Sequence, residues 1–94
     1  MLLLLDLGNS HTDFALWKDD AIAAHWRMAS DADRTEDDYA VWLLQLMEHE
    51  GLKPQKVVAA VISSVVPQAD FCMRRFVGKY FNVKPLIVGA PGVK

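Results

Sequence analysis

The stretch "DLGNSHT", residues 6–12, directly follows a run of four leucines and gathers polar groups suited to holding a phosphate. A turn between two strands presents successive backbone N–H groups in a concave arrangement, and we expect those of residues 8–11 to bind an anion in this way. The hydroxyls of Ser10 and Thr12 can donate to the same anion. Asp6, at the carboxyl end of the strand, would lie in the crevice where open α/β sheets bind ligands, and could hold Mg²⁺ there directly or through water. The alternative is a plain hairpin in which Asp6 accepts hydrogen bonds from turn amides.

Other polar residues could serve the same site or have a purely structural role. His11 can carry a positive charge near neutral pH, so it could attract a phosphate, or it could simply face solvent. Ser63 and Ser64 end a second apolar run that is expected beside the leucine run, so they could line the same crevice or cap the helix that follows. His25 and His49 are not spaced to share a metal with His11, so no zinc site is expected.

Three strands are expected around this turn. Residues 2–5 are apolar at every position, which is typical of a central strand covered on both faces. Gly8 and Asn9 both tolerate positive φ, so they predict a tight turn into a second strand over residues 12–17. Residues 22–29 alternate between an apolar and a polar face, the pattern of a strand near a sheet edge. The apolar members of this third strand are Ile22, Ala24, Trp26 and Met28.

A helix is expected next, ending at about Glu50. Thr35, with Asp38 three residues later, fits a capping box at its start, and Gly51 closes its end. One face of the helix is apolar, as packing on a sheet requires. That face carries Tyr39, Trp42, Leu43, Leu46 and Met47. The acidic residues of the first turn suit the helix dipole and are interpreted as a solvated face.

The remaining chain predicts a parallel extension of the sheet. Residues 56–64, "KVVAAVISS", form a nearly continuous apolar run, so a second central strand is expected there, parallel to the first. Pro67 suits the first turn of another helix, and residues 84–89, "KPLIVG", predict a last short strand. Residues 89–94, "GAPGVK", are expected to be loop. The order βββαβαβ therefore predicts an α/β domain whose mixed sheet joins an antiparallel three-strand meander to a parallel βαβ extension.

Composition limits the classes of protein that fit. A chain of 94 residues makes one domain, and its net charge of −2 without a Lys/Arg cluster argues against a nucleic-acid partner. The start "MLLLLD" has no basic segment and no cleavage site of small residues, so we expect a cytoplasmic protein with no membrane partner. The single cysteine, Cys72, cannot form an internal disulfide and is interpreted as a structural thiol inside a helix rather than a reactive one.

The order of elements resembles one half of the actin, sugar-kinase and heat-shock-chaperone ATPase superfamily, whose domains are ribonuclease-H-like. Within it, four stretches resemble the type III pantothenate kinases in order and spacing: "LLLLDLGNSHTDFALW", "AHWRMASDADRTEDDYA", "VISSVVP" and "PLIVGAPGVK". The first matches that family's phosphate motif, usually Asp-x-Gly-Asn-Thr-Asn-Thr, and "SSVVP" is a distinctive second match. The resemblance covers essentially all 94 residues.

This resemblance implies transfer of the γ-phosphoryl group of ATP to the primary hydroxyl of pantothenate, giving 4'-phosphopantothenate in the first step of coenzyme A synthesis. Such a transfer relies mainly on positioning and charge neutralisation. The resemblance assigns Asp6 to the metal and phosphate site, Gly8, Asn9 and Ser10 to the nucleotide phosphates, and Asn9 also to pantothenate. From the residues themselves, His11 and Thr12 are expected at the same phosphates. It further implies Mg²⁺, a monovalent cation (K⁺ or NH₄⁺) and a homodimer.

The chain departs from the family pattern in two ways. Ser10 keeps the hydroxyl of the usual Thr, whereas His11 replaces the usual Asn. The family's Gly-x-Asp-Arg motif, which supplies the aspartate thought to act as base, is expected beyond Lys94, together with most of the adenosine pocket. Residues 1–94 are therefore expected to be the N-terminal lobe of a two-lobed kinase, with weak binding at most and turnover near zero on their own.

Two other functions remain open. A lobe without the base could be a non-catalytic accessory or regulatory module that acts through protein partners. Asp6 with Gly8 and Asn9 favours the kinase, because a scaffold has no physical need for a carboxylate at that strand end. Another sugar or acid kinase of the superfamily would keep the phosphate loop but not "SSVVP".

Overall fold

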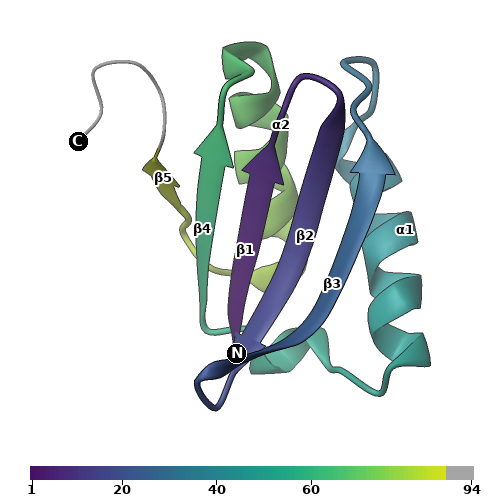
Figure 1. Ribbon diagram of the computed structural model, residues 1–94, viewed down its shortest axis with the longest axis vertical. Helices are drawn as coiled ribbons and strands as arrows, with labels where there is room; N and C mark the ends of the chain where they lie inside the picture. The colour runs from purple at the N-terminus through teal and green to yellow at the C-terminus, as the bar shows by residue number, and fades with distance from the viewer. Residues whose placement is uncertain (89–94) are drawn as a thin grey trace.

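The computed structural model describes residues 1–88, apart from the side chains of residues 67 and 68. The predicted order of elements is confirmed (Figure 1). The elements are β1 (Leu2–Leu7), β2 (His11–Lys18), β3 (Ala21–Ala29), α1 (Glu36–His49), the 3-10 turn η1 (Pro54–Lys56), β4 (Ala59–Ser64), α2 (Pro67–Phe81) and β5 (Leu86–Val88). The expected loop over residues 89–94 lies outside the described residues.

The five strands form one sheet in the order β3-β2-β1-β4-β5. β1 pairs antiparallel with β2, and β2 pairs antiparallel with β3. β4 runs parallel to β1, and β5 runs parallel to β4. The meander and its parallel extension are therefore as predicted, with β1 and β4 inside the sheet and β3 at an edge.

The core lies between one face of the sheet and the two helices. Leu3, Leu5 and Leu7 are buried on this face, and α1 and α2 both lie behind it (Figure 1). Aromatic rings fill the space between sheet and helices, with the Phe14 and Trp42 ring centroids 4.9 Å apart. The side chains that are fully buried include Phe14, Leu16, Leu43, Met47, Ile62, Met73, Phe76 and Val77.

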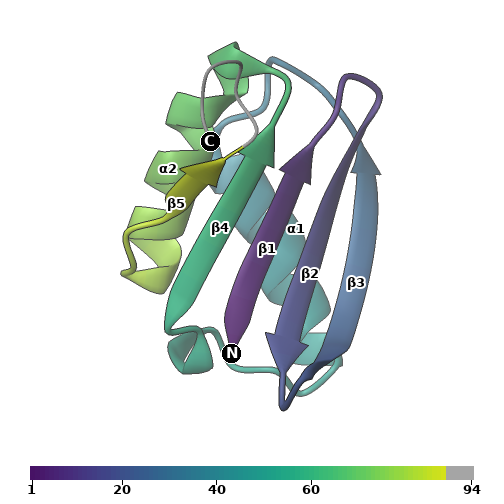
Figure 2. The ribbon, with the colours of Figure 1, turned by 60° about the vertical axis from the view of Figure 1, so that its left-hand side comes forward.

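The opposite face of the sheet is not covered by any helix of residues 1–88 (Figure 2). Leu2 and Leu4 on this open face are half-buried, and Asp6 is exposed. The prediction that β1 is central is confirmed, but cover on both of its faces is not found within the described chain. An unbroken apolar run identifies a central strand without showing what packs on each side of it.

One strand departs from the predicted alternation. A register shift between Leu16 and Trp17 places Ile22 opposite Trp17. Ile22 therefore lies on the open face and not on the inner face with Ala24. Ile22 is consequently 50% exposed. The expectation that Ile22 shares the inner face of β3 is therefore wrong, because one extra residue in a strand reverses the side on which the next residues point.

The predicted capping box at the start of α1 is confirmed. The Asp38 N–H donates to Thr35 Oγ1 at 3.2 Å, and the Thr35 N–H donates to Asp38 Oδ2 at 2.9 Å. Gly51 follows the helix with φ of +74°, a left-handed conformation that glycine adopts without strain. These local signals define both ends of α1.

The second helix packs beside the first and contains Cys72 as expected. Ion pairs join the helices: Arg75 Nη2 lies 2.8 Å from Glu36 Oε2, and Lys79 Nζ lies 2.9 Å from Asp37 Oδ1. Cys72 is half-buried, and burial raises the pKa of its thiol. A raised pKa disfavours the thiolate, which agrees with a structural role. No helix within residues 1–88 is long and apolar enough to span a membrane.

Candidate functional site

Three connections meet at one end of the sheet. The loop from β1 to β2, the segment after β3 and the segment from β4 to α2 all lie at the upper end in Figure 1. This end includes the carboxyl ends of the parallel strands β1 and β4, the position at which open α/β sheets bind ligands. The fold therefore places the "DLGNSHT" stretch where a ligand site is expected.

The loop between β1 and β2 does not adopt the conformation expected from its sequence. Neither Gly8 nor Asn9 has a positive φ, so the prediction of a turn built on left-handed residues is wrong. Gly8 matters for another reason: a Cβ on this residue would lie 2.9 Å from the backbone oxygen of His11. The Gly8 N–H donates to that same oxygen at 2.9 Å. Glycine is therefore needed here for close approach of two backbone segments.

This hydrogen bond also changes the predicted phosphate cradle. The Gly8 N–H is used inside the hairpin, so it is not available to a ligand. Within residues 1–88, the N–H groups of Asn9 and Ser10 find no acceptor, and both residues are exposed. Of the expected cradle, the part around Asn9 and Ser10 is thus left open to an anion.

Ser30, the residue after β3, holds the loop from outside. Its N–H donates to the Ser10 carbonyl at 2.9 Å, and its hydroxyl donates to the Gly8 carbonyl at 2.7 Å. Thr12 Oγ1 lies 3.0 Å from Ser30 Oγ, and Thr12 is the donor because the Ser30 proton is already used. The sequence alone did not identify Ser30 as part of the site. Ser30 could have been found from its position, because it directly follows a strand that was expected to pair with residues 12–17.

Asp6 lies on the open face of the sheet, in one row with neighbours from the adjacent strands. It stands opposite Asp13 on β2 and Ser63 on β4. Asp6 is exposed and makes no ion pair within the described residues. Its carboxylate is therefore available to a cation, and the alternative in which it binds turn amides is not observed there.

Asp13, in contrast, is already neutralised. Its Oδ1 accepts from Arg27 Nε at 2.9 Å and lies 2.9 Å from His25 Nε2. The hydrogen bond from Arg27 lowers the pKa of the Asp13 carboxyl; desolvation partly opposes this shift, and the bond with His25 adds to it. This trio was also missed by the sequence analysis, because its members come from two different strands.

The other predicted residues divide between the two faces. Thr12 is buried on the face that packs against the helices, whereas His11 is exposed at the start of β2. Ser63 lies beside Asp6 on the open face. The Ser64 hydroxyl instead donates to the Val66 carbonyl at 3.1 Å and accepts from the Val66 N–H at 3.0 Å, at the start of α2. Ser64 thus bonds locally to Val66, although α2 has no side-chain cap, so capping of the helix by Ser64 is not found.

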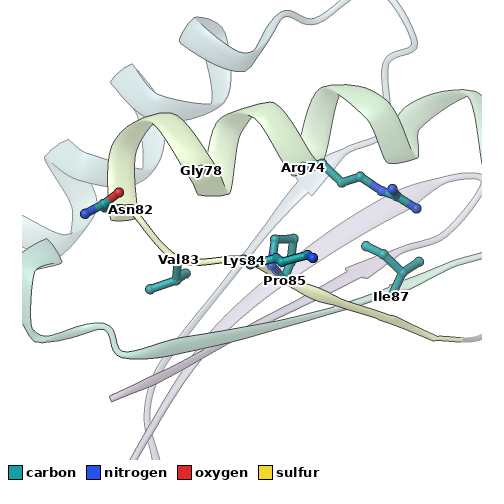
Figure 3. Close-up of a pocket in the computed structure, with 7 residues that line it drawn as sticks. All are labelled: Arg74, Gly78, Asn82, Val83, Lys84, Pro85 and Ile87. Atoms are coloured by element: carbon teal, nitrogen blue, oxygen red, sulfur yellow. The ribbon is translucent and has the colours of Figure 1, made fainter.

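A cavity of about 180 Å³ adjoins the loop on the side of the helices. Its lining comprises Leu7, Gly8, Asn9, Thr12, Ser30, Asp31, Ala32, Tyr39, Val66 and Ala69. A larger hollow of about 570 Å³ lies between α2 and the segment leading to β5, lined by Arg74 and Lys84 among others (Figure 3). None of the predicted site residues lines that hollow, whereas Gly8, Asn9 and Thr12 line the smaller cavity. Asp6 and Ser63 lie on the other face of the sheet.

Within residues 1–88, no group of three or more His, Cys, Asp or Glu side chains is arranged to hold a metal ion. A cation at Asp6 would thus need most of its ligands from water or a bound phosphate, as Mg²⁺ commonly does in kinases. The exposed Asp6 carboxylate beside the Ser63 hydroxyl fits such a cation, since both supply oxygen atoms.

Comparison with known proteins agrees with this geometry. A family model described as type III pantothenate kinase matches residues 2–94. A type III pantothenate kinase of Bacillus cytotoxicus is 42% identical over 94 residues, which are 100% of this chain and 36% of the relative. The chain therefore spans little more than a third of that relative's length.

Solved structures show the same fold at low sequence identity. A Bacteroides thetaiotaomicron protein with an actin-like ATPase fold and unknown function gives a TM-score of 0.62 at 9% identity, over 93% of this chain and 32% of its own. A putative N-acetylglucosamine kinase from Porphyromonas gingivalis gives a TM-score of 0.64 at 12% identity, over 96% of this chain and 34% of its own. YeaZ from Pseudomonas aeruginosa gives a TM-score of 0.63 at 13% identity, over 93% of this chain and 43% of its own. The predicted actin-like fold class is confirmed.

Proposed function

Because this chain belongs to the type III pantothenate kinase family, we propose that it binds the phosphates of ATP, with Mg²⁺, for transfer of the γ-phosphoryl group to pantothenate. This reaction would give 4'-phosphopantothenate, the first step of coenzyme A synthesis. The observation that carries the proposal is an exposed Asp6 beside a loop in which, as with Asp6 itself, the Asn9 and Ser10 N–H groups have no partner within residues 1–88.

The proposed division of work follows from the charges at the site. The N–H groups of Asn9 and Ser10 would donate hydrogen bonds to the negatively charged phosphate oxygens. Asp6 would hold Mg²⁺, with Ser63 available on the neighbouring strand. Bound Mg²⁺ would neutralise charge on the phosphates. Asp13 would not compete for the cation, since Arg27 and His25 already occupy its Oδ1.

The proposal includes properties that rest on the family resemblance alone. Residues 1–94 would form one lobe of a two-lobed kinase, and the acceptor hydroxyl would lose its proton to an aspartate of the Gly-x-Asp-Arg motif. A monovalent cation (K⁺ or NH₄⁺), a homodimer and a cytoplasmic location complete the proposal. The resemblance also places Asn9 near pantothenate. Independently of the resemblance, Ser63 would contact pantothenate because it lies beside Asp6, and His11 would lie near the phosphates.

Binding of Mg-ATP to the 94-residue chain tests the proposal, measured by NMR titration because the expected affinity is weak. Asp6→Asn removes one charge with little change of volume. We expect it to weaken Mg-dependent binding about tenfold, which corresponds to ~1.4 kcal/mol. Glu48→Asn, at an exposed position near the end of α1, is the matched control and should bind as the unmodified chain does.

Turnover is measured as pantothenate-dependent ADP release with K⁺ present, and the Bacillus cytotoxicus enzyme serves as the positive control. We expect release well below that of the positive control. Mg-ATP binding that is indifferent to Asp6→Asn would contradict the proposed role of Asp6. No binding of Mg-ATP at all would favour the accessory module instead.

A further inference from the structure

Ser30 makes three hydrogen bonds to the loop without belonging to it. It is separated from Gly8 by 22 positions in the sequence, yet its hydroxyl donates to the Gly8 carbonyl at 2.7 Å. Its N–H donates to the Ser10 carbonyl at 2.9 Å, and its oxygen accepts from the buried Thr12 hydroxyl at 3.0 Å. Ser30 thus bonds to both Gly8 and Ser10 in the loop, and also to the buried Thr12 side chain on β2.

The bond to Gly8 also determines where the Asn9 N–H points. The chain has no cis peptide bond among its described residues, and in a trans peptide the carbonyl of one residue and the N–H of the next point in opposite directions. Holding the Gly8 carbonyl toward Ser30 therefore turns the Asn9 N–H away from it.

We propose that Ser30 is a positioning residue of the phosphate loop, which fixes the Asn9 N–H in the direction of an incoming phosphate. It also engages two carbonyl oxygens that would otherwise repel that anion. Preorganised donors of this kind need no rearrangement when charge arrives, which is the condition for effective electrostatic stabilisation. This inference rests on the proposed function for its ligand, but not for its structural part.

Ser30 can act in this way because its own position is fixed. Arg34 Nη1 donates to the carbonyl of Ala29, directly before Ser30, and lies 3.2 Å from Met28 Sδ. The preceding strand β3 is paired with β2 up to Ala29. The loop between β1 and β2 is therefore bonded to the end of a paired strand and not to another loop.

The test compares three variants of the 94-residue chain. Ser30→Ala removes the hydroxyl, and Ser30→Thr keeps it. Thr35→Ala is the control, because it removes the side-chain cap of α1 and costs stability without contacting the loop. Backbone order parameters of Asn9 and Ser10 are measured by ¹⁵N relaxation without ligand, and Mg-ATP affinity is measured by NMR titration.

We expect Ser30→Ala to lower these order parameters from about 0.85 to below about 0.6, and to weaken Mg-ATP binding about fivefold. Ser30→Thr should restore both values, and Thr35→Ala should change neither. Unchanged order parameters in Ser30→Ala would overturn the proposal, as would lowered order parameters with full Mg-ATP affinity. If the unmodified chain does not bind Mg-ATP, the proposed function fails, and the order parameters still decide whether Ser30 positions the loop.

Discussion

The two turns of the antiparallel meander are held in opposite ways. The turn between β2 and β3 lies at Asp19 and Asp20, whose φ angles are +53° and +65°. Two successive left-handed residues form the type I′ turn, whose twist matches that of the paired strands. This turn holds its shape through its own backbone, at the end of the sheet opposite the candidate site (Figure 1).

The loop between β1 and β2 has no residue with positive φ and depends on contacts from elsewhere. The close approach of Gly8 to His11 holds it from within, and Ser30 holds it from β3. The turn between β2 and β3 only reverses the direction of the chain. The externally held loop keeps the N–H groups of Asn9 and Ser10 free, which is what a ligand-binding loop requires.

The largest effect that tests this comparison is expected from Gly8→Ala. The new Cβ would lie 2.9 Å from the backbone oxygen of His11, so the hairpin end must shift. We expect a loss of about 1–3 kcal/mol in the free energy of unfolding and loss of Mg-ATP binding. Urea denaturation and NMR titration measure the two effects.

Gly78→Ala is the matched control for Gly8→Ala. An added Cβ at Gly78, inside α2, meets no atom within 4 Å. Alanine should there raise stability by about 0.5–1 kcal/mol, because glycine is the poorer helix former. Equal effects of the two substitutions would show that close approach at Gly8 is not what matters.

A smaller effect of opposite sign is expected at the other turn. Replacing Asp19 and Asp20 together by Asn and Gly supplies the pair that type I′ turns prefer. We expect the free energy of unfolding to rise by about 0.5–1 kcal/mol, since the left-handed conformation then costs less. Mg-ATP binding should stay unchanged. A change in Mg-ATP binding would mean that the two turns are coupled, which would contradict the independence of the turn between β2 and β3.

The smallest effect concerns the charges beside the loop. Arg27 lowers the pKa of Asp13 in the folded state, so the Asp13 carboxylate stabilises the fold above its unfolded pKa of about 3.9, and this contribution is lost as pH falls toward the folded pKa. Arg27→Gln should raise the Asp13 pKa and reduce stability slightly at pH 7, with the difference shrinking as the pH falls toward the folded-state pKa. The effect is small because the Arg27 side chain is 58% exposed.

Titration of the Asp13 carboxyl carbon by NMR, with urea denaturation at pH 7 and pH 3, measures this effect. Arg74→Gln is the control, because Arg74 makes no ion pair among the described residues. An Asp13 pKa that is the same in Arg27→Gln would show that the ion pair does not persist in solution.

Local sequence was sufficient for the elements of this fold. The capping box of Thr35 and Asp38, the end of α1 at Gly51 and the start of α2 at Pro67 each depend on residues within one helical turn. The apolar runs identified β1 and β4 as central strands, and the alternation in β3 identified an edge. These patterns act over a few neighbours, so they can be interpreted without knowing the rest of the chain.

The site required the tertiary structure, because its contacts join residues that pairing alone brings together. Ser30 reaches Gly8 across 22 positions and Arg27 reaches Asp13 across 14, and neither pair follows any periodic pattern. Strand register decides such contacts, and a single extra residue reverses it, as Ile22 shows. The sequence therefore predicted a set of site residues, whereas packing decided that Asp6 is exposed on the open face while Thr12 is buried on the face toward the helices.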